Sequence, residues 1–219
     1  MIRVEHVEVF NFEGAIRGLR NPMNSWNKSD SYVCDEKHCG SCKQNPKTRD
    51  CSQPDGFIVG KNDLALMKKL YKAGTEHRKY LRQIFVSMDI VAPLYWWKEM
   101  DTYKVGTVAN SCSTMHKIAA KEFELDDFSH EHILDTHLIF DIIEELNHYR
   151  RLYLETKEKE YWWKMIQLLP SSYNQRRTIT MTYENVVSMI KQRDHHKLDE
   201  WNILSDIFKQ LPYIEEIME

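Results

Sequence analysis

Glycine is missing from more than half of this chain. All seven glycines of the 219-residue sequence lie at or before Gly106, and none occurs from residue 107 to residue 219. Glycine is the residue that most readily supplies left-handed or strained backbone, so its absence favours regular secondary structure. Four of the five cysteines also belong to the first half. We therefore predict flexible backbone and soft ligands in the first half, and a helical second half.

The composition is that of an ordinary globular protein. Hydrophobic residues make up 42% of the chain and charged residues 29%, and the formal net charge is −3. A chain of this length buries roughly 70% of the surface that it exposes when unfolded. The nearly balanced charge argues against a nucleic acid polymer as partner. No apolar stretch approaches about 20 residues and the N-terminal residues are charged, so we expect no membrane span, no signal peptide and a cytoplasmic location.

The spacing of apolar residues predicts the order of the elements. Residues 1–12 alternate between apolar and polar, as in an edge or half-buried strand, and residues 14–31 suggest a short helix or a loop. Residues 83–91 predict a strand, and Pro93 is expected in the first turn of a helix at 93–101. Residues 105–116 predict an irregular connection. Further elements are expected as helices at 62–74, 133–153, 158–168, 183–193 and 198–211, and a strand-like segment at 178–183. This order predicts an α+β fold, a single domain over residues 1–219 with a central sheet and a helix-rich C-terminal half.

A cysteine cluster lies in an expected insertion at about residues 29–56. The spacing C-x4-C-x2-C-x8-C is formed by Cys34, Cys39, Cys42 and Cys51. Thiolates this close in sequence can reach one metal ion, and zinc is the commonest structural choice, followed by an iron–sulfur cluster. Disulfides and four free thiols are the alternatives. We predict that a metal here would fix a loop and would take no part in catalysis.

The central segment carries the candidate binding groups. Polar side chains gather where the helix at 93–101 ends, at Lys98, Glu99, Thr102, Tyr103 and Lys104. The loop beyond it can donate several hydrogen bonds to a phosphate or to a uracil-like ring, from Thr107, Asn110, Ser111, Cys112 and Ser113. The alternative is a solvated helix end followed by a polar linker.

Cys112 is the one candidate nucleophile in this loop. A thiol whose pKa is lowered by a nearby cation could attack carbon-6 of a pyrimidine. The alternative for Cys112 is a small buried residue.

The central segment resembles the flavin-dependent thymidylate synthase family, ThyX. That family has a histidine, a strand, a helix led by Ala-Pro, an Arg-His-Arg motif and then a serine-containing loop. Here the order is His77, a strand ending at Val91, Ala92-Pro93, Thr102-Tyr103-Lys104 in place of Arg-His-Arg, and a loop from Thr107 to Met115. Residues 7–11 and 15–22 resemble the family's opening strand and helix. Residues 177–201 resemble its closing segment, where His196 and Glu200 fit a His-x-x-x-Glu pattern.

The chain resembles a divergent member of ThyX, because the signature motif has changed. Thr102-Tyr103-Lys104 keeps one cation, and a lysine is a point charge where the family has a planar bidentate fork. Lys98 and Glu99 match an Arg-Gln pair of the family. Thr114 stands where the family has a substrate-binding arginine.

The resemblance implies a homotetramer whose sites lie between subunits, with FAD and a deoxyuridine nucleotide as ligands and a folate-type one-carbon donor. It implies one-carbon transfer to carbon-5 of the nucleotide by an FAD-dependent methyltransferase of the thymidylate synthase type. The flavin would be held by His77, Tyr103, Lys104 and Asn110. The nucleotide would be held by Lys98, Glu99, Thr107, Ser111, Ser113 and Arg193. Two alternatives are a nucleotide-binding protein on a ThyX-like scaffold that has lost flavin chemistry, and a metal-stapled interaction module.

Overall fold

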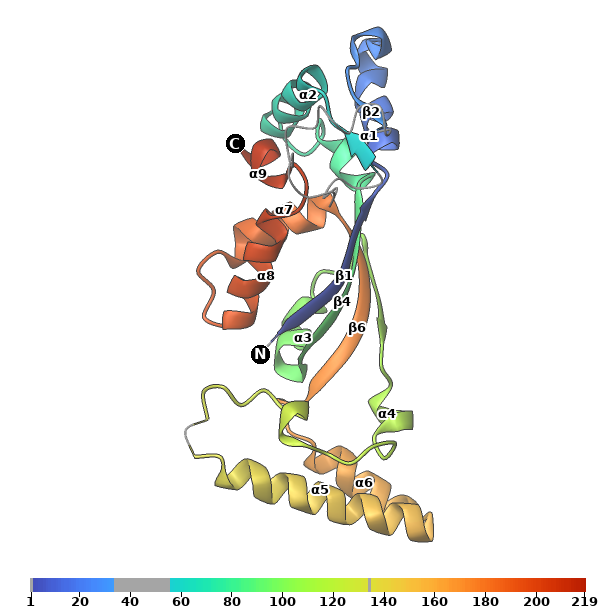
Figure 1. Ribbon diagram of the computed structural model, residues 1–219, viewed down its shortest axis with the longest axis vertical. Coiled ribbons are helices and arrows are strands. Elements are labelled where there is room, and N and C mark those ends of the chain that lie inside the picture. Colours follow the sequence, from blue (N-terminus) through green and yellow to red (C-terminus); the bar gives the residue numbers. More distant parts are fainter. Residues whose placement is uncertain (1, 34–55, 134) are drawn as a thin grey trace.

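The computed structural model describes residues 2–33, 56–133 and 135–219. Its main sheet has four strands in the order β1-β4-β6-β5, and every neighbouring pair is antiparallel (Figure 1). The strands of this sheet are β1 (Arg3–Phe10), β4 (Phe85–Pro93), β5 (Thr107–Ser111) and β6 (Asn174–Thr182). A second, two-stranded sheet joins β2 (Tyr32–Val33) to β3 (Phe57–Ile58).

Helices make up most of the rest of the described chain. The longer ones are α1 (Phe12–Arg20), α2 (Lys61–Lys72), α5 (His137–Thr156), α6 (Lys159–Leu168), α7 (Tyr183–Arg193) and α8 (Asp199–Lys209). The short ones are α3 (Leu94–Met100), α4 (Thr114–Lys117) and α9 (Ile214–Met218), with 3-10 turns η1 (Asn21–Met23), η2 (Trp26–Lys28), η5 (Lys79–Arg82) and η6 (Leu125–Asp127).

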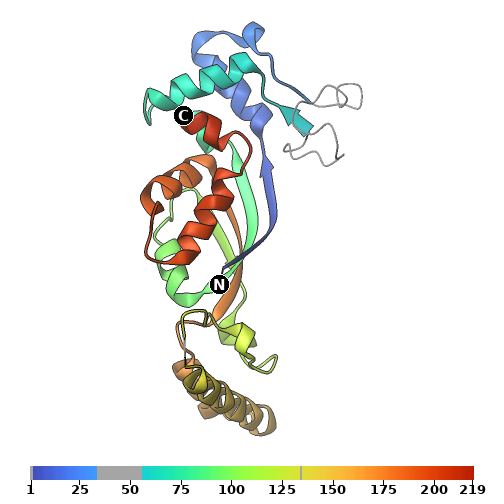
Figure 2. The same ribbon diagram turned by 60° about the vertical axis from the view of Figure 1, so that its left-hand side comes forward.

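The two faces of the main sheet differ. On β4, Val86, Met88 and Ile90 are buried, whereas the residues between them are half-buried. Successive side chains of a strand point to opposite faces, so the alternation marks one covered and one open face. Helices α3, α7 and α8 lie over the covered face (Figure 2). The open face carries Ser87 and Asp89 opposite Thr180 and Thr178 of β6.

The buried apolar residues form two clusters. The larger one joins the covered face of the sheet to α1, α2, α3, α7, α8 and α9. The smaller one joins α5 and α6 to the segment around η6 and includes Phe123, Phe128, Leu146 and Met165. Helices α5 and α6 form a hairpin at the end of the molecule opposite α2 (Figure 1). That the whole chain is a single domain therefore stays a prediction, which requires the two clusters to unfold together.

A buried carboxylate fixes the base of the cysteine-containing insertion. Asp63 of α2 accepts a hydrogen bond from Arg20 Nε at 2.5 Å, and both side chains are almost fully buried. Its other oxygen accepts from the hydroxyls of Ser29 at 2.7 Å and Ser31 at 2.6 Å. The backbone N–H groups of Asp30 and Ser31 also donate to it, each at 3.1 Å. The segment that leads into β2 is therefore anchored to α2, and the pair β2–β3 forms the stem of the insertion.

Most of the expected elements are confirmed. The α+β fold, the edge strand near the N-terminus and the helical character of the C-terminal half agree with the structure. Residues 14–31 begin within helix α1, which resolves that choice in favour of a helix. Pro93 is an exception, because it is the last residue of β4 and precedes α3 instead of lying in its first turn. Helix α5 begins at His137, later than expected, and α9 was not expected.

The prediction of an irregular connection at 105–116 is wrong. Residues Thr107–Ser111 form β5, which pairs with β6 through Ala109 opposite Ile179, and Thr114–Lys117 form α4. Four of the five β5 residues are exposed, so the strand lacks the alternating apolar pattern from which strands are recognised. Pairing with the neighbouring strand outweighs this weak local signal.

The predictions about metals and membranes can be compared with the structure only over the described residues. Cys34, Cys39, Cys42 and Cys51 lie outside the described residues. Within the described ranges, no group of three or more His, Cys, Asp or Glu side chains is arranged to hold a metal ion. Among these same residues, no helix has the length and apolar character needed to cross a bilayer.

Candidate functional site

The turn between α3 and β5 is the centre of the candidate site. Gly106 has a φ of 75°, which lies in the left-handed region that favours glycine. A Cβ at this position would lie 2.8 Å from Asn185 Oδ1. The Asn185 amide nitrogen donates to the carbonyl of Val105 at 2.7 Å, and Asn185 also belongs to the capping box that begins α7. The turn is therefore tied to the N-terminus of α7.

On one side of this turn, Glu99 and Arg193 form a closed polar network. Arg193 Nη1 donates to Glu99 Oε2 at 2.9 Å, and Arg193 Nε donates to the Tyr103 hydroxyl at 3.0 Å. The indole N–H of Trp201 donates to the same Glu99 oxygen at 2.9 Å. The Arg193 guanidinium also lies over the Trp201 ring, 4.6 Å from its centroid. The charge of Arg193 is thus compensated within the protein.

His196 closes the edge of this network. Its Nδ1 accepts a hydrogen bond from the backbone N–H of Leu198 at 3.1 Å, and its Nε2 lies 3.1 Å from Arg193 Nη1. Nε2 lies 3.4 Å from Glu99 Oε2. Glu99 Oε2 therefore accepts hydrogen bonds from α7 and from α8, with His196 of the loop between them beside it.

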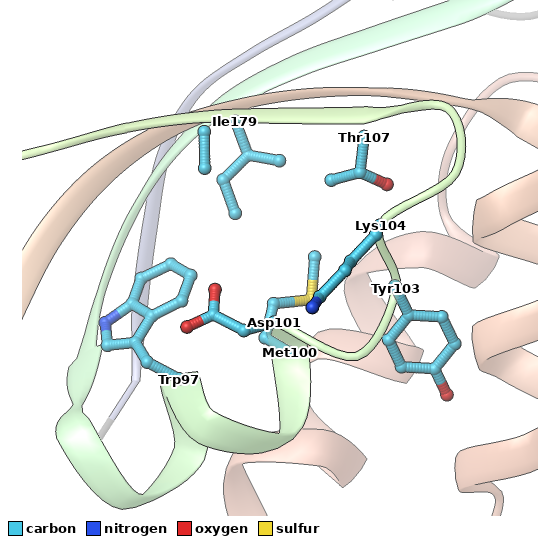
Figure 3. Close-up of a pocket in the computed structure, with 8 residues that line it drawn as sticks. Trp97, Met100, Asp101, Tyr103, Lys104, Thr107 and Ile179 are labelled. Carbon is cyan, nitrogen blue, oxygen red and sulfur yellow. The ribbon is translucent and has the colours of Figure 1, made fainter.

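A pocket opens on the other side of α3 (Figure 3). Its volume is about 150 Å³, and it is lined by Trp97, Met100, Asp101, Tyr103, Lys104, Thr107, Ala109 and Ile179. Lys104 and Asp101 extend into the space between α3 and the strands, whereas the Tyr103 hydroxyl points away from it (Figure 3). Tyr103 instead donates to Gln192 Oε1 at 2.9 Å. The pocket thus has an apolar floor and two charged groups at its rim.

Two polar groups of the pocket lack partners. Among the described residues, the Lys104 ammonium takes part in no hydrogen bond and no ion pair. The Thr107 hydroxyl oxygen is buried and has no hydrogen-bond partner in the part of the chain that the structure describes. Asp101, by contrast, pairs with Arg177 Nη1 at 2.6 Å, and the Arg177 guanidinium lies 4.2 Å from the centroid of Trp97. A buried hydroxyl without a partner is costly, so a ligand group that satisfied Thr107 would be favoured.

A wider groove lies beside the same turn. Its volume is about 420 Å³, and its lining consists of Arg82, Val105, Gly106, Thr182, Glu184, Asn185 and Ser188. Glu184 pairs there with Arg78 at 3.2 Å and with Arg82 at 2.6 Å. The turn at Gly106 thus separates a small apolar pocket from a larger, polar groove.

The open face of the sheet carries a further polar row. Asn110 of β5 lies opposite Thr178 of β6, which in turn lies opposite Asp89 of β4. Arg176 donates to Asp89 at 2.6 Å, and the Thr178 hydroxyl donates to its other oxygen at 2.5 Å. These hydrogen bonds lower the pKa of Asp89 below its usual range, and the bond from Arg176 has the larger effect. Asn110 therefore lies on the face away from the 150 Å³ pocket.

The structure divides the predicted site residues into groups. Glu99, Tyr103 and Arg193 meet in the closed network, and Lys104 and Thr107 share the pocket. Lys98, His77, Asn110 and Ser111 are exposed and lie elsewhere, and Ser113 caps α4 by accepting from the His116 N–H.

Cys112 is a free, exposed thiol, so the alternative of a small buried residue is wrong. Its carbonyl accepts a hydrogen bond from Gln175 and its N–H donates to Arg176. The bond from the Cys112 N–H to the Arg176 carbonyl continues the backbone pairing past the end of β5, and the side-chain amide of Gln175 adds the second bond.

Sequence reasoning missed Trp97, Asp101 and Trp201 as parts of the site, and it did not place Arg177 beside Asp101. Arg177 lies far from Asp101 in sequence, and only the pairing of β4 with β6 places the two in contact. No spacing in the sequence could have indicated this.

The fold is that of an α+β protein with an antiparallel sheet. The candidate site lies beside the covered face of this sheet and its edge strand β5. No family model and no curated protein sequence matches the chain. Two crystal structures of the flavin-dependent thymidylate synthase ThyX from Helicobacter pylori, both with FAD and dUMP, are similar to it. One has a TM-score of 0.68 and 15% identity and covers 99% of this chain and 96% of its own. The other has a TM-score of 0.67 and 16% identity and covers 98% and 95%. The chain therefore has a ThyX-like fold over nearly its whole length.

Proposed function

We propose that this protein is a flavin-dependent thymidylate synthase-like enzyme that transfers a one-carbon unit to carbon-5 of a deoxyuridine nucleotide. The observation that carries the proposal is the match over nearly the full length of both chains to ThyX structures that contain FAD and dUMP. A match of this extent includes the α3–β5 turn, where the sequence places its candidate binding groups. A folate-type compound is the proposed one-carbon donor.

The residues around the turn suit a phosphate-bearing cofactor in part. Lys104 offers an ammonium group that is uncompensated within the described chain, and we propose that it binds a phosphate of FAD. His77 and Asn110 would contact the remainder of the cofactor. Tyr103 would contact it while bonded to Arg193 in the closed network. The flavin, when bound, supplies the hydride chemistry, while the protein supplies binding and orientation.

The size of FAD points to an assembly. Pockets for drug-sized ligands span about 300–1,000 Å³, and FAD is larger than most such ligands. The two cavities beside the turn measure about 150 and 420 Å³ and share no lining residue. A complete FAD site therefore needs walls from another copy, which supports the proposal of a homotetramer with sites between subunits.

The proposed nucleotide contacts are Lys98, Glu99, Thr107, Ser111, Ser113 and Arg193. Lys98 and Ser111 are exposed and free to meet a phosphate, whereas Arg193 would have to exchange its bond to Glu99 for a bond to the nucleotide. Cys112 is the candidate nucleophile of this site, and its exposure makes it accessible to a bound pyrimidine.

A second candidate function is nucleotide binding without flavin chemistry. It is favoured by the closed Glu99–Arg193–Tyr103 network, in which three of the proposed ligand contacts already bond to one another. The replacement of Arg-His-Arg by Thr102-Tyr103-Lys104 also removes two guanidinium forks, which bind phosphate bidentately.

Calorimetric titrations with FAD and with dUMP test the proposal through Lys104→Ala. Loss of one charge-assisted contact is worth roughly 1.4 kcal/mol, so we expect about tenfold weaker FAD binding. Lys72→Ala is the matched control, because Lys72 is an exposed lysine on α2, far from the turn in sequence. Unchanged affinity of Lys104→Ala for both ligands would count against the assignment.

We also propose that Cys34, Cys39, Cys42 and Cys51 bind a structural zinc ion. The support is their spacing, together with the stem that Asp63 and Arg20 hold at the base of the insertion. Elemental analysis should find about one zinc per chain in the purified wild-type protein and no zinc in the Cys39→Ser/Cys42→Ser variant. Metal-free wild-type protein with four titratable thiols at these positions would contradict this.

A further inference from the structure

The pocket between α3, β5 and β6 has the dimensions of a site for one small ring. An engineered cavity of about 150 Å³ in another protein holds a benzene molecule, which is one six-membered ring. The pocket described above has a volume of about 150 Å³ (Figure 3). A flavin has three fused rings and cannot enter such a space.

The floor of the pocket is apolar and rigid. Trp97, Met100 and Ile179 are almost completely buried, so their positions are fixed by the main core. Trp97 is held further by its indole N–H, which donates to the carbonyl of Gln175 at 2.9 Å. A planar apolar ring gains most from a preformed wall of this kind, since the wall loses no conformational freedom on binding.

The charges at the rim of the pocket favour a ligand that carries a hydrogen-bond acceptor. The Asp101 carboxylate is compensated by Arg177 at 2.6 Å, and Arg177 is itself mostly buried. The Lys104 ammonium is not compensated by any described residue, and the buried Thr107 hydroxyl has no partner among them. The groups left to serve a ligand are thus one cation and one hydroxyl, both of which can donate to a carboxylate.

We propose that this pocket binds a monocyclic aromatic acid, with the ring against Trp97, Met100 and Ile179 and the carboxylate at Lys104 and Thr107. The site uses Lys104 and Thr107, which are also among the flavin and nucleotide contacts proposed above, so a monocyclic acid would bind there in place of those compounds. A nucleotide carries its negative charge on the phosphate, away from the base, and so does not match a ring that bears the anion directly.

Ligand-observed NMR with benzoate as the probe tests this site, because it detects the millimolar affinities expected of so small a ligand. We expect saturation transfer to the benzoate ring and a dissociation constant near 1 mM. Benzylamine, acetate and 1-naphthoate serve as comparison compounds that lack the negative charge, the ring or the small size, and each should bind at least fivefold more weakly.

Three variants locate the binding. Lys104→Met keeps the side-chain length and removes the charge, and Thr107→Val removes only the hydroxyl, so each should weaken benzoate binding at least fivefold. Ala109→Leu places bulk at the mouth of the pocket on an exposed strand position and should abolish the binding without disturbing the fold. Lys72→Met is the control and should bind like the wild type.

The proposal fails if wild-type protein does not bind benzoate, or if Ala109→Leu and Lys104→Met bind it as well as the wild type does. Equal binding of benzylamine would overturn the role of Lys104. Wild-type protein is titrated with benzoate in the absence of FAD and dUMP, so a failure to bind benzoate is distinguished from a failure to bind FAD or dUMP, while variants of Lys104 bear on both proposals.

Discussion

Two arginine–carboxylate pairs in this protein show how burial decides what such a pair contributes. Arg20 and Asp63 are 4% and 0% exposed, and four hydroxyl or backbone N–H donors of the segment before β2 also bind the carboxylate. Arg193 and Glu99 are 19% and 35% exposed. Removing one partner of a buried pair leaves an uncompensated charge, whereas a partly exposed pair is screened by water.

We predict that Asp63→Asn lowers the free energy of unfolding by about 3 kcal/mol or more. Glu99→Gln, the matched control in the exposed pair, should lower it by about 1 kcal/mol or less. Urea denaturation measures both. Similar losses in the two variants would show that burial does not separate these pairs.

Asp63 should also make stability depend on pH. Burial alone would raise its pKa, but the hydrogen bonds from Ser31, Ser29 and Arg20 outweigh burial and lower the pKa below the usual value of 3.8. A carboxyl whose pKa is lower in the folded state stabilises the fold above its unfolded pKa, and the stabilisation is lost as pH falls through the folded value. The urea midpoint should therefore fall more steeply below about pH 4 in the wild type than in Asp63→Asn.

At the scale of elements, the α3–β5 turn depends on one glycine. Gly106 has a positive φ, and a Cβ there would lie 2.8 Å from Asn185 Oδ1. Gly74 is a suitable comparison, since it also has a positive φ but no atom within 4 Å of a built Cβ. We predict that Gly106→Ala costs about 1 kcal/mol more than Gly74→Ala, measured by thermal or urea unfolding. Equal losses would mean that Asn185 moves aside freely.

The α5–α6 hairpin packs on its own apolar cluster, so it should respond separately from the sheet. Leu146 is fully buried in that cluster, and its replacement by alanine should cost roughly 2–5 kcal/mol. In Leu146→Ala, hydrogen exchange should accelerate in α5 and α6 and stay unchanged in β4 and β6. Ile179→Ala in the sheet is the control and should accelerate exchange in β4 and β6. Uniform acceleration in both variants would establish one cooperative unit.

The sequence predicted elements well where apolar residues follow a strong period. Helices α2, α6, α7 and α8 have such a period, and their positions agree with the structure within a few residues. Strand β5 lacks it, because its small polar residues are ordered by pairing with β6. The same reason separates the site residues that could be predicted from those that could not. Lys104 and Thr107 follow one helix in sequence, but Arg177 reaches Asp101 only through the register of the sheet.

For the whole molecule, the similar structures establish the fold, and the binding chemistry depends on the residues of the site. A ThyX-like fold persists at 15–16% identity to the two solved structures, because the alternation on β4 and the apolar faces of the helices are enough to specify the layers. The Thr102-Tyr103-Lys104 segment lies in the turn after α3, and Glu99 and Arg193 are partly exposed residues near the ends of α3 and α7. Function must therefore be decided at the turn, with the fold as background.

The visible absorption spectrum of the purified protein, before and after incubation with FAD and removal of unbound ligand, tests the flavin assignment most directly. We predict retained flavin with absorption in the blue, and loss of that absorption in Lys104→Ala under the same conditions. A colourless protein that retains no FAD after incubation would contradict flavin-dependent transfer. Binding of dUMP by that colourless protein would then establish the second candidate function.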